Sequence, residues 1–313
     1  MARAYGWNAQ LLLAFESTYG TPPVSGFKKM PFVSRDISAQ QGLIASNVIG
    51  LGRDPTQPYQ DAINVDGDIV VPVDLRNIGQ WLKALLGSPT TTGSAAPYNH
   101  AFKSGATSLP SLSLETGLPQ IPAFFMVAGV RVNSMAFNFT RSGEATATIN
   151  CIGQGETRNA TTQGGTPTQA NYTRFSQFQG AIKQGGSALA NVTSASVTYS
   201  NNLEKIETIR SDGKLDGVDS GIAALTGSVA VRYADNTLID LASAGTAVDL
   251  EFSYTIDANN KLVILCHEVY LPKPKIGIQG PGGVEASYDF QGARNTAANA
   301  MVTVTLVNDV ASY

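Results

Sequence analysis

The sequence predicts a mainly β protein made of two tandem β-sandwich or rolled-sheet modules, each with one short flanking α-helix. The chain of 313 residues contains 31 glycines, and only 14% of its residues are charged. This composition is typical of many short strands joined by turns, not of a helical bundle. Several segments alternate apolar and polar residues, and a stretch around Gly67 is repeated around Gly227.

Period-two alternation is the main strand signal. Val130 and Val132 alternate with polar residues and, beyond a break, so do Phe137 and Phe139. The same pattern occurs in residues 192–199 and in residues 302–306. Such alternation indicates strands with one buried and one exposed face.

In the first half of the repeat, the sequence of residues 62–71 aligns with that of residues 222–231. Gly67 matches Gly227, and alternating apolar positions follow in both copies. The constant offset between the two stretches suggests an internal duplication.

A short helix is predicted after each of these strands. In the first copy Asp74 is the N-cap candidate, Gly87 ends the helix, and apolar residues have helical spacing at Ile78, Trp81, Leu82, Leu85 and Leu86. In the second copy Asp235 is the N-cap candidate, Gly245 lies near the end, and the apolar positions are Leu238, Leu241 and Ala242.

The similarity resumes further on with a second, smaller offset. Residues 124–132 resemble residues 263–271, and residues 143–149 resemble residues 282–288. A loop insertion in the first module, at residues 87–108, accounts for the difference between the two offsets. We therefore predict four parts: an N-terminal arm (1–30), a first module (31–155), a linker (156–175) and a second module (176–313).

The charge pattern disfavours tight nucleic-acid binding. The net charge is −3 and the isoelectric point is about 5.4, and no Lys/Arg cluster is present. The apolar run Leu11–Phe15 is too short for a signal peptide, and no segment approaches the length of a membrane span. We expect a soluble protein made in the cytoplasm, with no membrane partner.

No constellation for catalysis is found. His100 is expected to be a solvated loop residue, and His267 follows Cys266 on a strand, where neighbours point to opposite faces. Cys151 and Cys266 lack metal-site spacing and are expected to be buried thiols.

Acidic and aromatic clusters also have structural explanations. The carboxylates Asp212, Asp216 and Asp219 could suggest calcium, but their spacing favours a polar turn. The aromatic set of Trp81 and Phe124–Phe125 is expected in the core. We therefore predict that the protein is not an enzyme and has no catalytic, cofactor-binding or metal-binding residues and no cofactors.

Several segments resemble the major tail tube proteins of siphophages, which have long non-contractile tails. At the N-terminus these are Leu12–Pro22, with its Glu-Ser-Thr-Tyr-Gly-Thr-Pro turn, and the strand Phe27–Val33. In the second module they are Val197–Leu203, Arg210–Gly213 and Thr226–Val231. The resemblance covers most of the chain.

The resemblance implies tail-tube-like modules that stand side by side in rings, with inner strands joined into a ring-wide β-barrel. Stacked rings would form the virion tail channel for double-stranded DNA, with tape-measure, tail terminator and tail tip proteins as partners. A weakly acidic lining would let DNA slide without sticking. Ring-to-ring contacts are expected from residues 1–30, 87–108 and 153–175.

Because related rings contain six modules, two modules per chain predict a homotrimeric, pseudo-hexameric ring; a homohexamer is the alternative. A different class of function, a carbohydrate-binding or adhesin-like β protein of a tail tip or cell surface, stays open. So does another virion role, such as a contractile-tail inner tube, a tail terminator or a head decoration protein.

Overall fold

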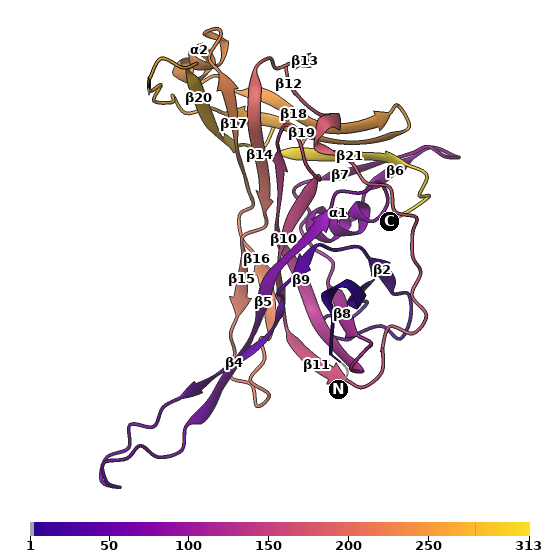
Figure 1. The fold of residues 1–313 in the computed structure, drawn as a ribbon, viewed down its shortest axis with the longest axis vertical. Helices are drawn as coiled ribbons and strands as arrows, with labels where there is room; N and C mark the ends of the chain where they lie inside the picture. The colour runs from indigo at the N-terminus through magenta and orange to yellow at the C-terminus, as the bar shows by residue number, and fades with distance from the viewer. Residues whose placement is uncertain (1–2, 279) are drawn as a thin grey trace.

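The structure, a computed structural model, describes residues 3–278 and 280–313. It confirms the predicted mainly β fold, with antiparallel strands and two short α-helices (Figure 1). Nineteen of the described strands form three connected sheets, here called the main, end and side sheets, and two further strands form a small separate sheet. The described strands of one chain do not close into a barrel.

The main sheet runs the length of the molecule (Figure 1). Its seven strands, in spatial order, are β4 (Ser38–Ile44), β5 (Tyr59–Pro72), β10 (Thr146–Gly153), β9 (Ala123–Phe139), β14 (Val192–Ser200), β17 (Ala224–Arg232) and β20 (Glu285–Gly292). The two-residue strand β3 (Ser34–Arg35) precedes β4 along the same side of β5.

The end sheet crosses the main sheet at one end. Its strands are β12 (Gly180–Gln184), β18 (Val248–Asp257), β19 (Asn260–Tyr270), β21 (Val302–Asn308), β7 (Tyr98–Lys103) and β6 (Thr90–Thr92), with β13 (Ser187–Ala188) beside β12. Aromatic rings from the two layers pack against each other. Phe139 of β9 stacks on Tyr254 with ring centroids 4.7 Å apart, and the ring centroids of Phe252 and Phe290 of β20 are 6.0 Å apart. This packing fits a β-sandwich.

The side sheet shares β9 with the main sheet. It comprises β2 (Lys28–Met30), β1 (Gln10–Phe15), β8 (Leu112–Leu118), the first half of β9 and β11 (Gly155–Asn159). Thus β1 and β2 lie in the range assigned to an N-terminal arm, with Leu11 and Leu13 buried, and β11 reaches into the range assigned to a linker. The segment boundaries 1–30, 31–155, 156–175 and 176–313 remain a prediction.

A β-bulge explains the break in the alternation of β9. Cys151 pairs with Val132 and the preceding Asn150 pairs with Ser134, so Asn133 is the extra residue. A bulge reverses which side chains face the core. The buried residues therefore change from Val130 and Val132 to Met135, Phe137 and Phe139.

The predicted first helix is confirmed as α1 (Ile78–Leu86), which is buried between the main sheet and the end sheet. Asp74 lies one turn before it, and its carboxylate accepts hydrogen bonds from the backbone amides of Arg76, Asn77 and Ile78. Gly87 ends the helix with a positive φ of 90°. Asp74 thus satisfies amides at the helix start, although Asn77 is the N-cap by position.

The predicted second helix is confirmed as α2 (Thr237–Ala244). It lies at the surface, with Leu238 and Ala242 buried. Asp235 accepts a hydrogen bond from the amide of Thr237, and Gly245 ends the helix in the left-handed conformation. Neither α-helix of the described chain has the length and apolarity needed to cross a bilayer.

Strand registers repeat with the two offsets read from the sequence. Gly67 pairs with Cys151, and its counterpart Gly227 pairs with Phe290, which is the counterpart of Cys151 at the second offset. The β8–β9 and β18–β19 hairpins have the same pairing and the same register shift, with Leu112–Val130 corresponding to Val248–Val269. Here β9 and β19 follow the second offset of 139 residues (269 − 130), while β8 and β18 are 136 residues apart (248 − 112). In the first copy, the segment between α1 and β8 includes β6 and β7; β7 pairs with β21 of the end sheet, and β6 pairs with the other side of β7.

The repeated glycine has a packing reason in both copies. A Cβ on Gly67 would lie 2.7 Å from the backbone of Ile37, and one on Gly227 would lie 2.2 Å from the carbonyl oxygen of Ser196. Both distances are far inside van der Waals contact, so only glycine lets the preceding strand approach so closely.

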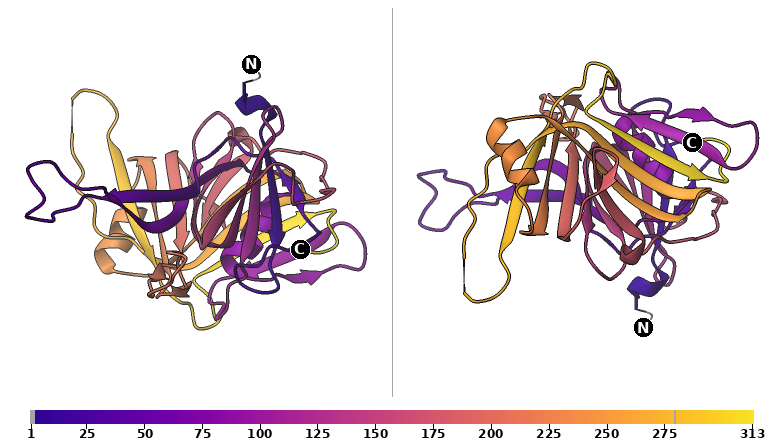
Figure 2. Two further views of the ribbon diagram at one scale, coloured as in Figure 1. Left: turned by 90° about the horizontal axis from the view of Figure 1, so that it is seen from below. Right: turned by 90° about the horizontal axis from the view of Figure 1, so that it is seen from above.

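Two hairpins of different length lie at one end of the main sheet. The β4–β5 hairpin projects well beyond the body (Figures 1 and 2). Its counterpart, formed by β15 (Leu203–Ile206) and β16 (Gly217–Ser220), is shorter and lies against the base of β5, where Ile63 donates a backbone hydrogen bond to Gly213. Sequence reasoning did not single out the long hairpin.

Candidate functional surface

One face of the main sheet is polar across its whole width; we call it the polar face. On β14 the side chains of Ala195, Val197 and Tyr199 are buried in the core, while Ser196 and Thr198 lie on the opposite side. The other strands alternate in the same way. The result is a sheet with one apolar and one polar surface.

Strand pairing aligns these polar residues into rows that cross the sheet. The first row is Asp68, Asn150, Ser134 and Ser200; the second is Val70, Thr148, Ala136, Thr198, Thr226 and Gln291; the third is Asn138, Ser196, Ser228 and Asp289. Most members are small and uncharged, and no lysine or arginine occurs in these rows.

Hydrogen bonds between neighbours hold several of these side chains in place. Asn150 donates to Asp68 Oδ1 at 2.7 Å and accepts from Asn133 at 3.1 Å. The hydroxyls of Ser196 and Ser228 share a hydrogen bond of 3.0 Å. Donors and acceptors that are satisfied within the sheet compete less for an external ligand.

The charges within the rows are acidic. Asp68 and Asp289 lie within the rows and are exposed. At the margins, Lys205 is 2.5 Å from Asp66 and Arg232 is 3.2 Å from Glu285, so these two cations are paired with carboxylates. The surface therefore offers a DNA phosphate backbone little attraction.

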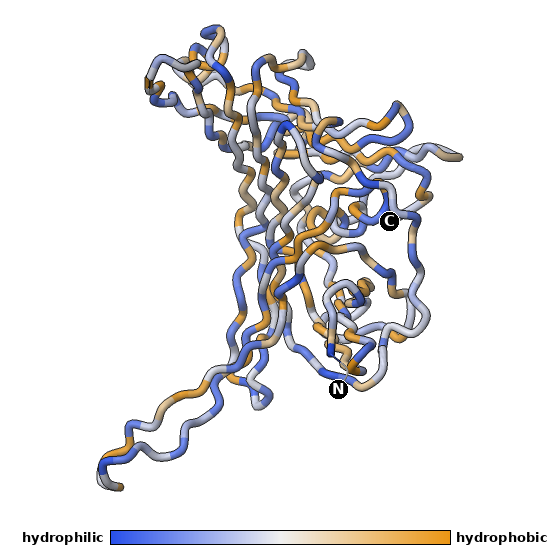
Figure 3. The backbone as a smooth tube through the Cα atoms, in the orientation of Figure 1, coloured by the Kyte–Doolittle hydropathy of each residue, from blue (hydrophilic) through white to orange (hydrophobic). Residues whose placement is uncertain are grey.

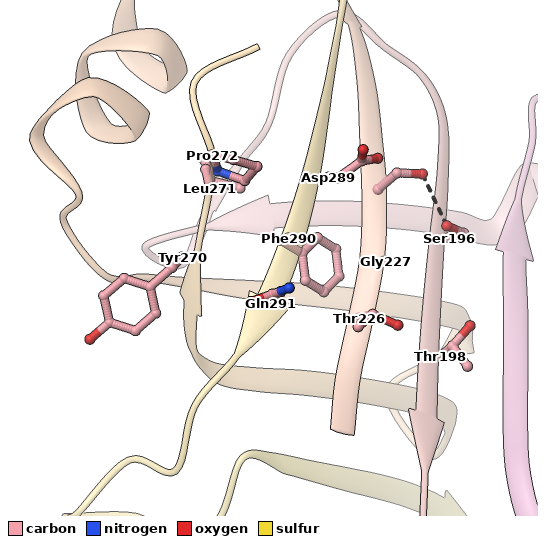
Figure 4. Close-up of a pocket in the computed structure, with 11 residues that line it drawn as sticks. Ser196, Thr198, Thr226, Gly227, Tyr270, Leu271, Pro272, Asp289, Phe290 and Gln291 are labelled. Atoms are coloured by element: carbon pink, nitrogen blue, oxygen red, sulfur yellow. Dashed lines mark hydrogen bonds between the residues drawn. The ribbon is translucent and has the colours of Figure 1, made fainter. Parts of the chain in front are cut away.

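An open groove lies on the polar face where β14, β17 and β20 meet the end of β19 (Figure 4). Its floor carries Ser196, Thr226 and Asp289, and Tyr270 and Pro272 form one wall. The floor residues are short hydroxyls and one carboxylate, with no histidine or cysteine to act as a base or nucleophile.

The two cysteines are buried and free, as predicted. Burial raises the pKa of Cys266 to about 12 and raises that of Cys151 further. Both thiols therefore stay protonated and unreactive at neutral pH.

Both histidines are held in structural contacts, and the prediction for His100 was wrong. His100 is completely buried on β7, where its Nε2 donates to the carbonyl oxygen of Val310 and its Nδ1 accepts from the hydroxyl of Thr91, both at 2.8 Å. His267 hydrogen-bonds to the hydroxyl of Thr303 at 2.7 Å. Desolvation lowers the pKa of both imidazoles.

The acidic loop of the second copy forms internal ion pairs. The Arg210 guanidinium lies 2.9 Å from both Asp212 and Asp216, and it holds the pKa of Asp212 well below its usual range. No group of three potential metal ligands occurs among residues 3–278 and 280–313. Of the aromatic set, Trp81 is buried in the core as predicted, while Phe124 and Phe125 are half-buried.

The tip of the β4–β5 hairpin is the other unusual surface. Ile49 is 96% exposed, and Leu43, Val48 and Leu51 are also largely exposed. Figure 3 shows this apolar stretch far from the body of the molecule. Exposed apolar residues gathered on a projecting arm indicate a contact surface for another protein.

Comparison with known proteins places the chain in a family. The family model described as phage tail tube protein matches residues 6–292. No curated protein matches the sequence significantly. Because the match spans nearly the whole chain, the protein belongs to the phage tail tube protein family.

Proposed function

We propose that this chain is the major tail tube subunit of a siphophage and that it stacks as rings around the channel through which phage DNA is delivered. Membership of the tail tube family supports a structural role in the virion tail. The polar face is the observation that carries the finer proposal, because it is the surface best suited to line such a channel.

A channel lining that binds DNA weakly lets the duplex slide. Each phosphate that a lysine or arginine neutralises adds salt-dependent affinity, so a basic lining would retain DNA. The polar face instead presents hydroxyls, amides and the carboxylates of Asp68 and Asp289. Double-stranded DNA would pass over it without sequence preference and without strong binding.

We further propose a homotrimeric ring with pseudo-sixfold symmetry. The repeated registers support two modules per chain, with boundaries at residues 31–155 and 176–313. Three such chains supply the six modules of a ring. Ring-wide pairing of the main sheets would also satisfy the open edges that one chain leaves.

The β4–β5 hairpin is proposed to join stacked rings. Its reach and its exposed apolar tip, with Ile49 and Leu51 at the end, suit insertion against the neighbouring ring. The predicted contact regions 1–30, 87–108 and 153–175 would add to this contact. Tape-measure, terminator and tip proteins would complete a tail assembled in the host cytoplasm.

Electron microscopy of the purified protein tests the proposal. We expect tubes or stacked rings with a central hole, and native mass spectrometry of an isolated ring should give three chains. A six-chain ring would contradict the trimer alone. Persistent monomers that bind glycans would support a carbohydrate-binding role in place of the tube.

A further inference from the structure

The end of the main sheet is incomplete beside β20. β19 and β20 pair only at Val269–Gly292 and Tyr270–Gln291. Beyond these two pairs residues 271–278 leave the sheet as a loop, part of the extended amber segment in Figure 2. On the side of β20 away from β17, residues 285–290 have no partner among the described strands.

The first half of the chain shows what the complete arrangement looks like. By the second offset of the repeat, Tyr270–Gln291 is the counterpart of the Arg131–Ile152 pair of β9 and β10. In that copy β9 continues through Phe139; residues 134–137 pair with β10 on one side, and residues 134–139 pair with β14 on the other. The corresponding residues, 273–278, form no strand here.

The loop sequence suits a strand. Ile276 packs partly against the core and Ile278 is 79% exposed, and they correspond to the buried Phe137 and Phe139. Lys275 and Gly277 alternate with them and correspond to polar-face positions. Pro274 would be the first strand residue, a position that proline tolerates because a missing N–H costs least there.

The missing neighbour can be identified from the same repeat. β14 pairs with β17 in the register in which β3 and β4 pair with β5: Ser194–Ala230 corresponds to Ser34–Val70, and Thr198–Thr226 to Ser38–Asp66. The counterpart of β14 is therefore the β3–β4 segment. Its outer edge is unpaired in the described strands, and it lies at the opposite end of the main sheet from β20.

We propose that residues 274–278 change from loop to strand on assembly and pair on one side with β20 of their own chain and on the other with residues 35–39 of a second copy. The inference rests on the proposed ring. If the new strand pairs as β9 pairs with β14, Ile276 lies opposite Ile37 of the partner subunit and Lys275 lies opposite Ser38 of the partner subunit. A strand that begins with proline forms few hydrogen bonds when it has a neighbour on one side only. Pairing with the second copy on the other side therefore stabilises it.

Charge complementarity supports this register. Lys273 would lie beside Asp289 of its own β20, and Lys275 diagonal to Asp36 of the partner subunit. Among the ion pairs of residues 3–278 and 280–313, none involves Lys273, Lys275, Asp36 or Asp289. Opposite charges on adjacent strands stabilise pairing, and the two lysines would be neutralised on the polar face.

The added strand also gives a channel of suitable width. The seven strands of the main sheet and the new one make eight per chain, hence 24 in a three-chain ring. At a spacing of about 4.8 Å and a tilt of about 40°, such a barrel has a backbone diameter of roughly 50 Å. Side chains as short as those of the polar face leave room for a DNA duplex.

Disulfide trapping tests the pairing. In the double variant Ser38→Cys with Lys275→Cys, oxidation of assembled tubes should give a reduction-sensitive product of three chains, three times 32.9 kDa. The control, Ser38→Cys with Gly282→Cys, places the second thiol in the same loop but outside the strand and should remain a single chain. Native Cys151 and Cys266 are buried and do not interfere.

Tubes that show no cross-link, or equal cross-linking of the control, would overturn this inference and leave the proposed function intact. Absence of tubes from the wild-type protein would instead remove the proposed function. Hydrogen exchange on wild-type tubes covers the case in which the variants do not assemble. Amides of residues 275–278 should exchange more slowly in tubes than in free chains, and unchanged exchange would contradict the strand.

Discussion

Asn150 donates a hydrogen bond to the Asp68 carboxylate at 2.7 Å, across the β5–β10 ladder of the polar face. The amide keeps the carboxylate fixed and exposed without neutralising its charge. A fixed negative charge at this place repels phosphate, so its reversal should alter how DNA interacts with the proposed channel.

We therefore expect the variant Asp68→Lys to assemble tubes that retain DNA. Three added lysines in a three-chain ring would give a binding constant that falls about 40-fold between 50 and 200 mM salt. Filter binding of duplex DNA to tubes across this range measures the slope. Asp240→Lys on α2, off the polar face, is the control, and equal DNA retention by it would argue against the assigned lining.

Removal of the Asp74 carboxylate should destabilise the fold. Asp74 is buried and accepts hydrogen bonds from three successive backbone amides at the start of α1. Asp74→Ala leaves these donors unsatisfied, at a cost of about 1–3 kcal/mol in the free energy of unfolding. Urea denaturation measures it, and Asp74→Ser, which keeps one acceptor, should lose less.

The burial of His100 should make stability depend on pH. Its pKa is lowered in the folded state by desolvation, so between that value and about 6.5 the unfolded chain binds more protons. Stability from this group is complete above about pH 6.5 and decreases as the pH falls. The melting temperature of the wild type should drop more between pH 8 and pH 5 than that of His100→Gln. Parallel drops would show that His100 does not contribute.

Alanine at the repeated glycine should be poorly tolerated. The Cβ of Gly227→Ala would meet the Ser196 carbonyl oxygen at 2.2 Å and the ring of Phe290 at 2.4 Å. Relief of these overlaps requires movement of β14, so we expect a loss of about 1–3 kcal/mol in unfolding free energy. Gly282→Ala has open space around the added methyl group and should be close to wild type in the same denaturation experiment.

The hairpin tip should control stacking without affecting the fold. Ile49→Ser removes a side chain that is 96% exposed, so the melting temperature of the free chain should be unchanged. We expect electron microscopy to show single rings or short tubes, whereas Ile49→Val should restore normal length. Full-length tubes from the serine variant would exclude this residue from the ring-to-ring contact.

Local signals predicted the helices and the strand cores correctly. The spacing of Ile78, Trp81 and Leu85 is a property of neighbouring residues, and so is the alternation in β14 and β21. The repeated glycines Gly67 and Gly227 were identified by position, and their packing reason appeared only in the structure.

Features that depend on distant partners were not predicted. His100 is buried because β7 pairs with β21, near the other end of the chain, and because Val310 and Tyr313 cover its ring. The long hairpin was not predicted because its residues are exposed and therefore lack the apolar–polar alternation of a strand with one buried face. The polar face required the registers of five strand pairs before its rows could be read.

The unequal hairpins have a consequence for the whole tube. In a three-chain ring only alternate modules would carry the β4–β5 hairpin, while those between them carry the short β15–β16 hairpin. Two rings could then dock in three rotational settings instead of six. A rotation by one module would bring each long hairpin to a position that fits only a short hairpin. Duplication followed by divergence of the two modules would therefore fix the rotational register between stacked rings.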